Sequence, residues 1–386
     1  MKYNKFGSAM VSILGFGGLR FPSYENDDKH VDIEKSVEML LRAFELGINF
    51  VDTSPIYRSG ESEMAIGKAL KLTSKKIYVS SKFPFINNPK SGEYSRYLEN
   101  SLKCMDIETI DFYHFHGITK DIFDNIIVPQ GFLKEAINAK EQGLINHISF
   151  SFHDRPEAMQ YIIDKAEIME TVLCQYNIID QSNKDAMIYA KKKGLSVAVM
   201  GPLGGGKFVM PNELKDDGQL VKRNSTAETA LRFVESNENV DLILSGMKSI
   251  QMLEENVKIV SEHTPFTKDD IDTLNRMISE NESIAECYCT ECSYCLPCPQ
   301  RINIPYVLRL FNFHKVDGLT QYAKVKFSDF AQKRDVKIST IGSTTPISIG
   351  ENPANCISCG ICEKRCPQRL KISAKISEAV KELGNI

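Results

Sequence analysis

The sequence lacks long hydrophobic runs and carries little net charge. No window of about eighteen apolar residues occurs in the 386-residue chain, so we expect no membrane span. Residues 1–5 lead into no apolar stretch like that of a signal peptide, which favours a cytoplasmic protein over a secreted one. The net charge of −3 gives no reason to expect a nucleic-acid partner.

A dinucleotide-binding glycine motif is also missing. Residues 13–18 predict a first strand that ends in Gly17 and Gly18, but the spacing G-x-G-x-x-G does not occur there. Doubly wound sheets usually carry such a turn after their first strand, so its absence argues against that fold. The content of 42% hydrophobic and 25% charged residues is that of a globular protein, long enough for two domains or a large barrel with an appendage.

Apolar runs and segments with helical periodicity alternate eight times. We expect strands at residues 13–18, 48–51, 77–80, 110–115, 145–150, 171–175, 195–200 and 240–244, and helices at residues 31–46, 62–70, 94–103, 130–142, 156–165, 183–193, 225–235 and 250–260. Eight such units predict a closed (β/α)₈ barrel. A short hairpin around Gly7 and Ser8 is expected before them, and one more helix at residues 266–279 after them.

Ionisable side chains follow three consecutive strands. Asp52 comes after the second strand, Lys82 after the third and His116 after the fourth, and Tyr57 lies on the loop beyond Asp52. Active sites of such barrels form at the carboxyl ends of the strands, and neighbouring strands are about 4.8 Å apart. We therefore expect these four side chains to converge.

The four residue types suit proton transfer to a carbonyl oxygen. Asp52 would keep a buried Lys82 charged, and that cation would lower the pKa of Tyr57 toward working pH. Tyr57 could then protonate a carbonyl oxygen as hydride arrives, while His116 orients that oxygen. Each residue alone also has a structural explanation, since a strand-end Asp often caps a helix. Four compatible types at successive strand ends favour an active site.

These residues resemble the catalytic motifs of the aldo-keto reductase family. The matching segments are Asp52-Thr53 with Tyr57, Ser81-Lys82, Asp111-Phe112-Tyr113-x-x-His116, Gly60-Glu61-Ser62-Glu63 and Gln175-Tyr176-Asn177. The resemblance covers residues 1 to about 265 and implies a (β/α)₈ barrel that interconverts a carbonyl and an alcohol with NADPH or NADH. It implies that Asp52, Tyr57, Lys82 and His116 are the catalytic residues.

The same resemblance implies a set of nucleotide contacts. Ser151 and Gln175 match residues that hold the nicotinamide amide, and Lys248 is the candidate for binding a 2′-phosphate. The implied cofactor-binding residues are Gly18, Ser151, Gln175, Met200, Gly201, Pro202, Leu203, Gly206, Lys248, Glu255 and Asn256.

Nine of the eleven cysteines lie between Cys287 and Cys366, a crowding that favours metal over disulfides in a cytosolic chain. One run is Cys289-x2-Cys292-x2-Cys295-x2-Cys298-Pro299, and the other is Cys356-x2-Cys359-x2-Cys362-x3-Cys366-Pro367. The second run matches the bacterial ferredoxin pattern, and the first differs from it by one residue in the last gap. The isolated Cys104 and Cys174 are expected to be buried small hydrophobes.

In two-cluster ferredoxins the fourth cysteine of each run binds the other cluster. We therefore expect two [4Fe–4S] clusters, with the ligand sets Cys289, Cys292, Cys295 and Cys366, and Cys356, Cys359, Cys362 and Cys298. Structural zinc and a single cluster with spare cysteines are the alternatives. The segment resembles the ferredoxin-type extension of one branch of the aldo-keto reductases. We predict a barrel at residues 1–265 and a small, mainly helical ferredoxin-like domain at residues 266–386.

Two functions are compatible with this sequence. The first is a cytoplasmic oxidoreductase that acts on a small carbonyl or alcohol at Tyr57. A hydride carries two electrons and a cubane cluster accepts one, so this function calls for a redox partner protein, a flavin, or a structural role for the clusters. The second is a non-enzymatic electron carrier or redox sensor whose barrel binds a nucleotide or docks a partner.

Overall fold

The computed structural model describes residues 1–24, 27–85, 88–204, 226–280, 289, 293–315, 320–332, 336–338, 347–366 and 368–384. The chain divides into two units, Met1–Leu203 with Ala227–Phe266, and Gly204–Thr226 with Thr267–Ile386. Within the residues described, no helix is both long and apolar enough to cross a membrane.

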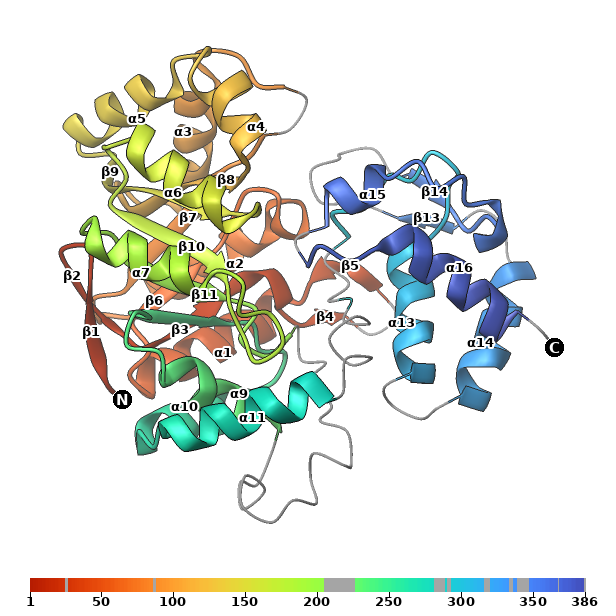
Figure 1. Ribbon diagram of the computed structural model, residues 1–386. Helices are drawn as coiled ribbons and strands as arrows, with labels where there is room; N and C mark the ends of the chain where they lie inside the picture. The colour runs from red at the N-terminus through yellow and green to blue at the C-terminus, as the bar shows by residue number, and fades with distance from the viewer. Residues whose placement is uncertain are drawn as a thin grey trace. The chain divides into compact units, whose positions relative to one another are not determined.

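Eight parallel strands of the first unit close into a barrel (Figure 1), which confirms the predicted fold. They are β3 (Leu14–Gly17), β6 (Phe50–Asp52), β7 (Tyr78–Phe83), β8 (Ile110–Ile118), β9 (Ile145–Phe152), β10 (Thr171–Gln175), β11 (Ser196–Met200) and β12 (Leu242–Ser245). Each strand pairs with the next along the chain, and β12 pairs with β3 to close the ring.

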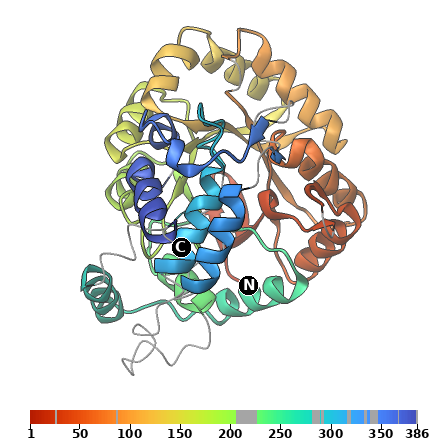
Figure 2. The same cartoon turned by 90° about the vertical axis from the view of Figure 1, so that its right-hand side faces the viewer.

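Helices surround these strands, as Figure 2 shows. They are α1 (Ile33–Glu45), α2 (Glu61–Lys71), α3 (Glu93–Met105), α5 (Phe132–Glu141), α6 (Pro156–Lys165), α7 (Lys184–Lys192), α9 (Thr226–Glu235) and α10 (Ile250–Glu262), with the short α4 (Lys120–Ile122), η1 (Gly18–Arg20), η2 (Tyr57–Gly60) and η3 (Phe123–Ile127) in connections. The first helix begins later than its pattern predicted. Residue 31 ends an unpredicted hairpin of β4 (Ser23–Tyr24) and β5 (Asp27–Val31), and the Asp32 carboxylate then caps α1 by accepting from Lys35 N.

The barrel interior is apolar at its base because inward-facing residues alternate along each strand. Phe50, Phe112 and Leu173 belong to this layer, and Phe6 of the hairpin β1 (Tyr3–Phe6) and β2 (Ala9–Ser12) packs against it. The Phe6 ring centroid lies 5.8 Å from that of Phe50 and 4.8 Å from that of Phe112. The predicted hairpin therefore closes the end of the barrel opposite the carboxyl ends of the strands.

His147 connects this hairpin to the barrel. Its ring stacks on Phe112 at 4.6 Å, its Nε2 accepts from Ser8 N at 3.3 Å, and its Nδ1 lies 2.8 Å from Glu170 Oε2. These contacts hold the turn at Gly7, where φ is +58° and an added Cβ would lie 2.7 Å from His147 Cε1.

Gly7→Ala is expected to lower the free energy of unfolding by roughly 2–3 kcal/mol. The left-handed backbone costs an L-residue about 1–2 kcal/mol, and the methyl group must also displace the buried His147 ring. Urea unfolding followed by circular dichroism measures the loss. Gly143→Ala is the matched control, because φ is +74° there and no atom lies within 4 Å of the added Cβ. Equal losses in the two variants would show that the ring moves without cost.

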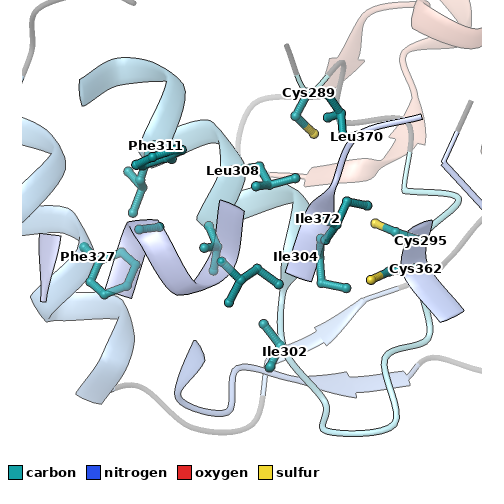
Figure 3. Packing of buried hydrophobic residues seen from close by; sticks show 14 of the residues in the cluster. Cys289, Cys295, Ile302, Ile304, Leu308, Phe311, Phe327, Cys362, Leu370 and Ile372 are labelled. Atoms are coloured by element: carbon teal, nitrogen blue, oxygen red, sulfur yellow. The ribbon is translucent and has the colours of Figure 1, made fainter. Parts of the chain in front are cut away.

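The second unit is mainly helical, as predicted. Its elements are α11 (Lys268–Glu280), α13 (Ile304–Lys315), α14 (Thr320–Gln332), β13 (Val336–Ile338), β14 (Ile347–Ile349), η5 (Pro353–Asn355), α15 (Ile361–Lys364) and α16 (Ile372–Leu383). Leu308, Phe311 and Phe327 pack with Ile372 in its core, where Figure 3 shows them together with three cysteines. His314 Nε2 and Glu382 Oε2, 2.8 Å apart, join α13 to α16.

Candidate active site

Strand register places the predicted polar residues on the inner face of the barrel, above the apolar base. Asp52 is the partner of Ser80 across β6 and β7, and Lys82 is the partner of His114 across β7 and β8. His116 follows His114 by two residues and so faces the same side. Asp52, Lys82 and His116 lie within strands rather than after them, because the ladders continue further than the apolar runs predicted.

Asp52 and Lys82 form a buried ion pair. Lys82 Nζ lies 2.6 and 2.7 Å from the two Asp52 carboxylate oxygens and 2.6 Å from Thr53 O, and Ser80 Oγ donates to Asp52 Oδ1 at 2.7 Å. Lys82 is only 1% exposed. Burial lowers the pKa of Lys82, and the charge of Asp52 opposes that change. Three acceptors match the three N–H donors of an ammonium group, so the geometry fits a charged lysine.

Tyr57 lies beside this ion pair. Its backbone N–H donates to Ser54 O at 3.0 Å at the start of η2, and its side chain is 7% exposed. Lys82 Nζ is 4.8 Å from the centroid of the Tyr57 ring. The rings of Tyr57 and His116 meet edge-on, with centroids 5.8 Å apart and planes at 81°. The structure thus brings together the four residues proposed for catalysis from the sequence.

The positive charge of Lys82 acts on three buried histidines. Burial lowers the pKa of His114 to about 3 and of His153 to about 4, with the positive charge of Lys82 as the next cause in both. Burial likewise holds the pKa of His116 well below its usual value, and His116 Nδ1 lies 3.2 Å from Ser54 Oγ. All three rings are therefore neutral at pH 7, and a neutral imidazole can donate one hydrogen bond and accept another.

His114→Phe is expected to make stability less sensitive to acid. The unfolded chain binds a proton on this histidine below about pH 6.5, whereas the folded state, with a pKa of about 3, does not. The contribution of this histidine to the free energy of unfolding is therefore lost as pH falls. At pH 5 the loss is about 2 kcal/mol. Urea midpoints at pH 7.5 and 5.0 give the loss of stability on acidification for the wild type and for the variant. Subtracting one loss from the other removes the contributions of the other titratable groups. An unchanged pH dependence would contradict this assignment.

Glu63 is a second buried carboxyl group near Lys82, and no role was predicted for it. It lies on α2, is 2% exposed, and its Oε1 accepts from Ser81 Oγ at 2.6 Å. Burial raises the pKa of Glu63, and the hydrogen bond from Ser81 and the charge of Lys82 oppose that change. Two carboxyl groups thus interact with the charge of Lys82. Of the two, Asp52 is the one that accepts hydrogen bonds from its ammonium group.

Gln175 offers an unsatisfied amide to a ligand. It is 6% exposed, and its Nε2 has no hydrogen-bond partner within the described ranges of the chain. Its main-chain oxygen accepts from Asn183 Nδ2 at 2.9 Å, which fixes the backbone. A Cβ at Gly201 would lie 2.6 Å from Gln175 Nε2, so only glycine lets the amide lie this close to the backbone. An unpaired buried amide fits a polar ligand group such as a carboxamide.

The other implied nucleotide contacts are placed as follows. Ser151 is buried, and its Oγ accepts from Gly117 N at 2.6 Å. Met200 is the β11 partner of Gln175. Pro202 is buried and Leu203 half-buried, whereas Lys248 and Glu255 are exposed. The buried Asn256 donates from Nδ2 to Ser245 Oγ at 3.2 Å. Gly206 lies outside the described residues.

Two glycines explain close packing near these contacts. A Cβ at Gly18 would lie 2.5 Å from Ser62 Oγ, so that glycine is needed for contact with α2 whether or not it also binds a cofactor. A Cβ at Gly246 would lie 3.0 Å from Arg20 Cβ. Arg20 thus lies beside the segment that contains Lys248, and it is a cation that the sequence analysis missed because the two are far apart in the chain.

One predicted cluster ligand set surrounds a single cavity in the second unit. Its lining residues are Cys295, Cys298, Pro299, Gln300, Ile304, Cys356, Ile357, Ser358, Cys359, Ile361, Cys362, Ser373 and Ile376. They include all four cysteines of the second set, together with Cys295. No group of three or more His, Cys, Asp or Glu side chains in the described ranges is arranged around one metal ion. Zinc needs its ligands around a single ion, whereas a cubane needs thiolates spread around a larger cluster. The apolar cavity lined by these cysteines therefore suits a cubane better than it suits zinc.

The structure describes the other predicted set only in part. Cys292 lies outside the described residues, and Figure 3 shows Cys289 beside Leu370, away from Cys295, which lies near Cys362. The expectation for Cys104 was wrong. The apolar face of α3 is formed by Tyr94, Leu98, Leu102 and Met105, and Cys104 lies off that face and is exposed. Cys174 is buried as expected.

Known proteins with similar sequences and structures agree with this architecture. Residues 13–279 match the model of the aldo/keto reductase family, and residues 288–370 match that of a 4Fe-4S dicluster domain. L-galactose dehydrogenase of Arabidopsis thaliana is 27% identical over 314 residues, which cover 72% of this chain and 91% of that protein.

Solved structures show the same fold. Aldo-keto reductase AKR11C1 from Bacillus halodurans, in its holo form, aligns with a TM-score of 0.59 and 24% identity over 72% of this chain and 96% of that one. An aldo/keto reductase from Klebsiella pneumoniae in complex with NADP and acetate aligns with a TM-score of 0.59 and 19% identity, over 72% and 95% of the two chains.

Proposed function

The chain belongs to the aldo/keto reductase family and is an oxidoreductase with a 4Fe-4S domain, and we propose that its barrel interconverts a small carbonyl and an alcohol with NADPH or NADH. The observation that carries this proposal is the fully hydrogen-bonded Lys82–Asp52 pair with Tyr57 and His116 beside it. We further propose domain bounds of residues 1–265 and 266–386.

The residues would act on the substrate oxygen. The positive charge of Lys82 favours the phenolate form of Tyr57, so the phenol gives up its proton more readily in the direction of reduction. Neutral His116, beside the Tyr57 ring, would donate a hydrogen bond to the same oxygen and orient it. Asp52 holds Lys82 in place and offsets the desolvation of its charge.

A nicotinamide nucleotide fits the residues present. When bound, it supplies or accepts the hydride. Gln175 Nε2 and the Ser151 hydroxyl would bind the carboxamide and so orient the ring toward Tyr57. Arg20 and Lys248 would face the phosphate end of the cofactor. The Klebsiella pneumoniae relative was solved with NADP, which supports this choice of ligand without deciding between NADPH and NADH.

The second unit would hold two [4Fe–4S] clusters. Cys298, Cys356, Cys359 and Cys362 surround one cavity, which supports one complete ligand set. Bound there, a cluster supplies one-electron transfer. Coupling to two-electron hydride chemistry then calls for a flavin or a redox partner protein.

Anaerobic assays of the purified full-length chain test the proposal. We expect a panel of small aldehydes and ketones to stimulate NADPH or NADH oxidation at 340 nm. We also expect close to eight iron and eight sulfide atoms per chain and no stoichiometric zinc. Zinc at one or two atoms per chain would overturn the cluster assignment. No oxidation of either nucleotide with any carbonyl, by a protein that binds that nucleotide, would overturn the reductase assignment.

A further inference from the structure

Exposed apolar side chains border the cysteine cavity of the second unit. Ile357 is 60% exposed and Ile361 is 37% exposed, although both line the cavity together with Cys356 and Cys362. Cys359, which lies between the two isoleucines in the chain and also lines the cavity, is exposed. A cluster bound by these cysteines would therefore have one edge at the protein surface, flanked by apolar side chains that have no role in the core.

The charged residues around this edge are mostly basic. Residues 353–371 contain four basic side chains and one acidic side chain. Lys364, Arg365, Arg369 and Lys371 are all exposed. Glu363 is half-buried, and its Oε1 accepts from Ser373 N at 2.8 Å, so its charge is partly used within the unit.

Two of these basic residues lie close to the cavity. Lys364 is three residues from Ile361 on α15, a spacing that puts both on one side of the helix. Arg365 Nη1 lies 3.4 Å from Leu296 O, next to the cavity residue Cys295. The edge of the cavity therefore combines an apolar centre with a positively charged border.

We propose that this surface, formed by Ile357, Ile361, Lys364, Arg365 and Lys371 and here called the basic face, docks a small acidic one-electron carrier protein. Lys371 belongs to it because it is exposed and lies two residues before the cavity residue Ser373. The inference rests on the proposed function, since it requires a redox-active cluster in the cavity. One electron leaves the reduced centre of the carrier and enters the cluster, or moves in reverse. Redox encounters bury little surface, so a compact apolar patch with steering charges suits them.

A second explanation for the basic residues is that they offset the negative charge of the thiolates. That role would act on the reduction potential of the cluster, whereas docking acts on the rate with which a charged partner reacts. Exposed charges are strongly screened by water and salt, so their removal should change the potential little. Potential and partner rate therefore distinguish the two explanations.

The test is anaerobic stopped-flow reduction of the oxidised full-length protein by a reduced plant-type ferredoxin, which is acidic. The test variant is Lys364→Glu/Lys371→Glu, and the control is Lys381→Glu, an exposed lysine in the last turn of α16. We expect the second-order rate constant to fall about tenfold or more in the test variant at low ionic strength, and less than threefold in the control. The wild-type rate should fall as salt is added, while iron content and reduction potential stay constant in all three proteins.

Reduced methyl viologen is a small cation that needs no docking surface. It therefore tests whether the cluster is redox-active, separately from whether the basic face docks a carrier. If viologen bleaches the iron–sulfur band but the two variants react equally with ferredoxin, the basic face is not a docking surface. The same conclusion follows if the wild-type rate is insensitive to salt. If viologen bleaches no band in a protein with full iron content, the redox role of the cluster fails, and the docking proposal fails with it.

Discussion

Tyr57→Phe is expected to lower kcat for carbonyl reduction by about 10²- to 10⁴-fold, the usual contribution of a general acid. The substitution removes one oxygen and leaves the ring in place against Lys82 and His116. Binding of the nicotinamide nucleotide should change little, because Tyr57 is not among the contacts proposed for it. Steady-state kinetics with the best carbonyl substrate and fluorescence titration of NADPH measure the two quantities.

Tyr113→Phe is the matched control for this experiment. Tyr113 follows Phe112 on β8 and so faces away from the barrel interior, and its hydroxyl has no hydrogen-bond partner among the residues that the structure describes. We expect kcat to stay within about twofold of wild type, because this hydroxyl cannot reach the substrate. If both variants retained full activity, Tyr57 would not be the proton donor.

Cys359→Ala is expected to remove about half of the iron and sulfide, or about four atoms of each per chain. Cys359 lines the cavity with the other three cysteines of its set, and without it one iron atom of the cubane lacks its thiolate ligand. Nicotinamide-dependent activity of the barrel should survive if the clusters do not take part in the hydride step. Colorimetric iron and sulfide assays on anaerobically purified protein measure the loss.

Cys104→Ala serves as the control for cluster content. Cys104 is exposed on α3 and lies outside both cysteine runs, so iron and sulfide should equal those of wild type. A Cys359→Ala protein that kept all its iron would show that this cysteine is a spare, which favours the single-cluster alternative.

The barrel and its polar layer were predictable because both follow from local patterns. Apolar runs and helical periods give the order of strands and helices, and an alternation of two residues gives the inner face. Asp52, Lys82 and His116 lie on successive strands, so the closed parallel topology alone brings them to one end of the barrel. Tyr57 could be placed near them because only four residues separate it from Asp52.

Features that depend on contacts between distant segments were not predictable. Arg20 lies beside Gly246 only because β12 pairs with β3. The exposure of Cys104 depends on which side of α3 packs against its neighbours. The apolar residues near it in the chain therefore led to the wrong prediction that it is buried. The length of β8 was underestimated because its pairing with β9 resumes at Ile118, beyond a register shift after Phe115.

Transfer of deuterium from NADPH labelled at the nicotinamide C4 position tests the central claim most directly. Under anaerobic conditions and with oxidised clusters, the account predicts an alcohol product that carries one deuterium atom, and far less of it with Tyr57→Phe. An alcohol formed without deuterium from either C4-labelled form, while NADPH bleaches the iron–sulfur band, would contradict the account, because the electrons would then reach the substrate without a hydride step at the barrel site.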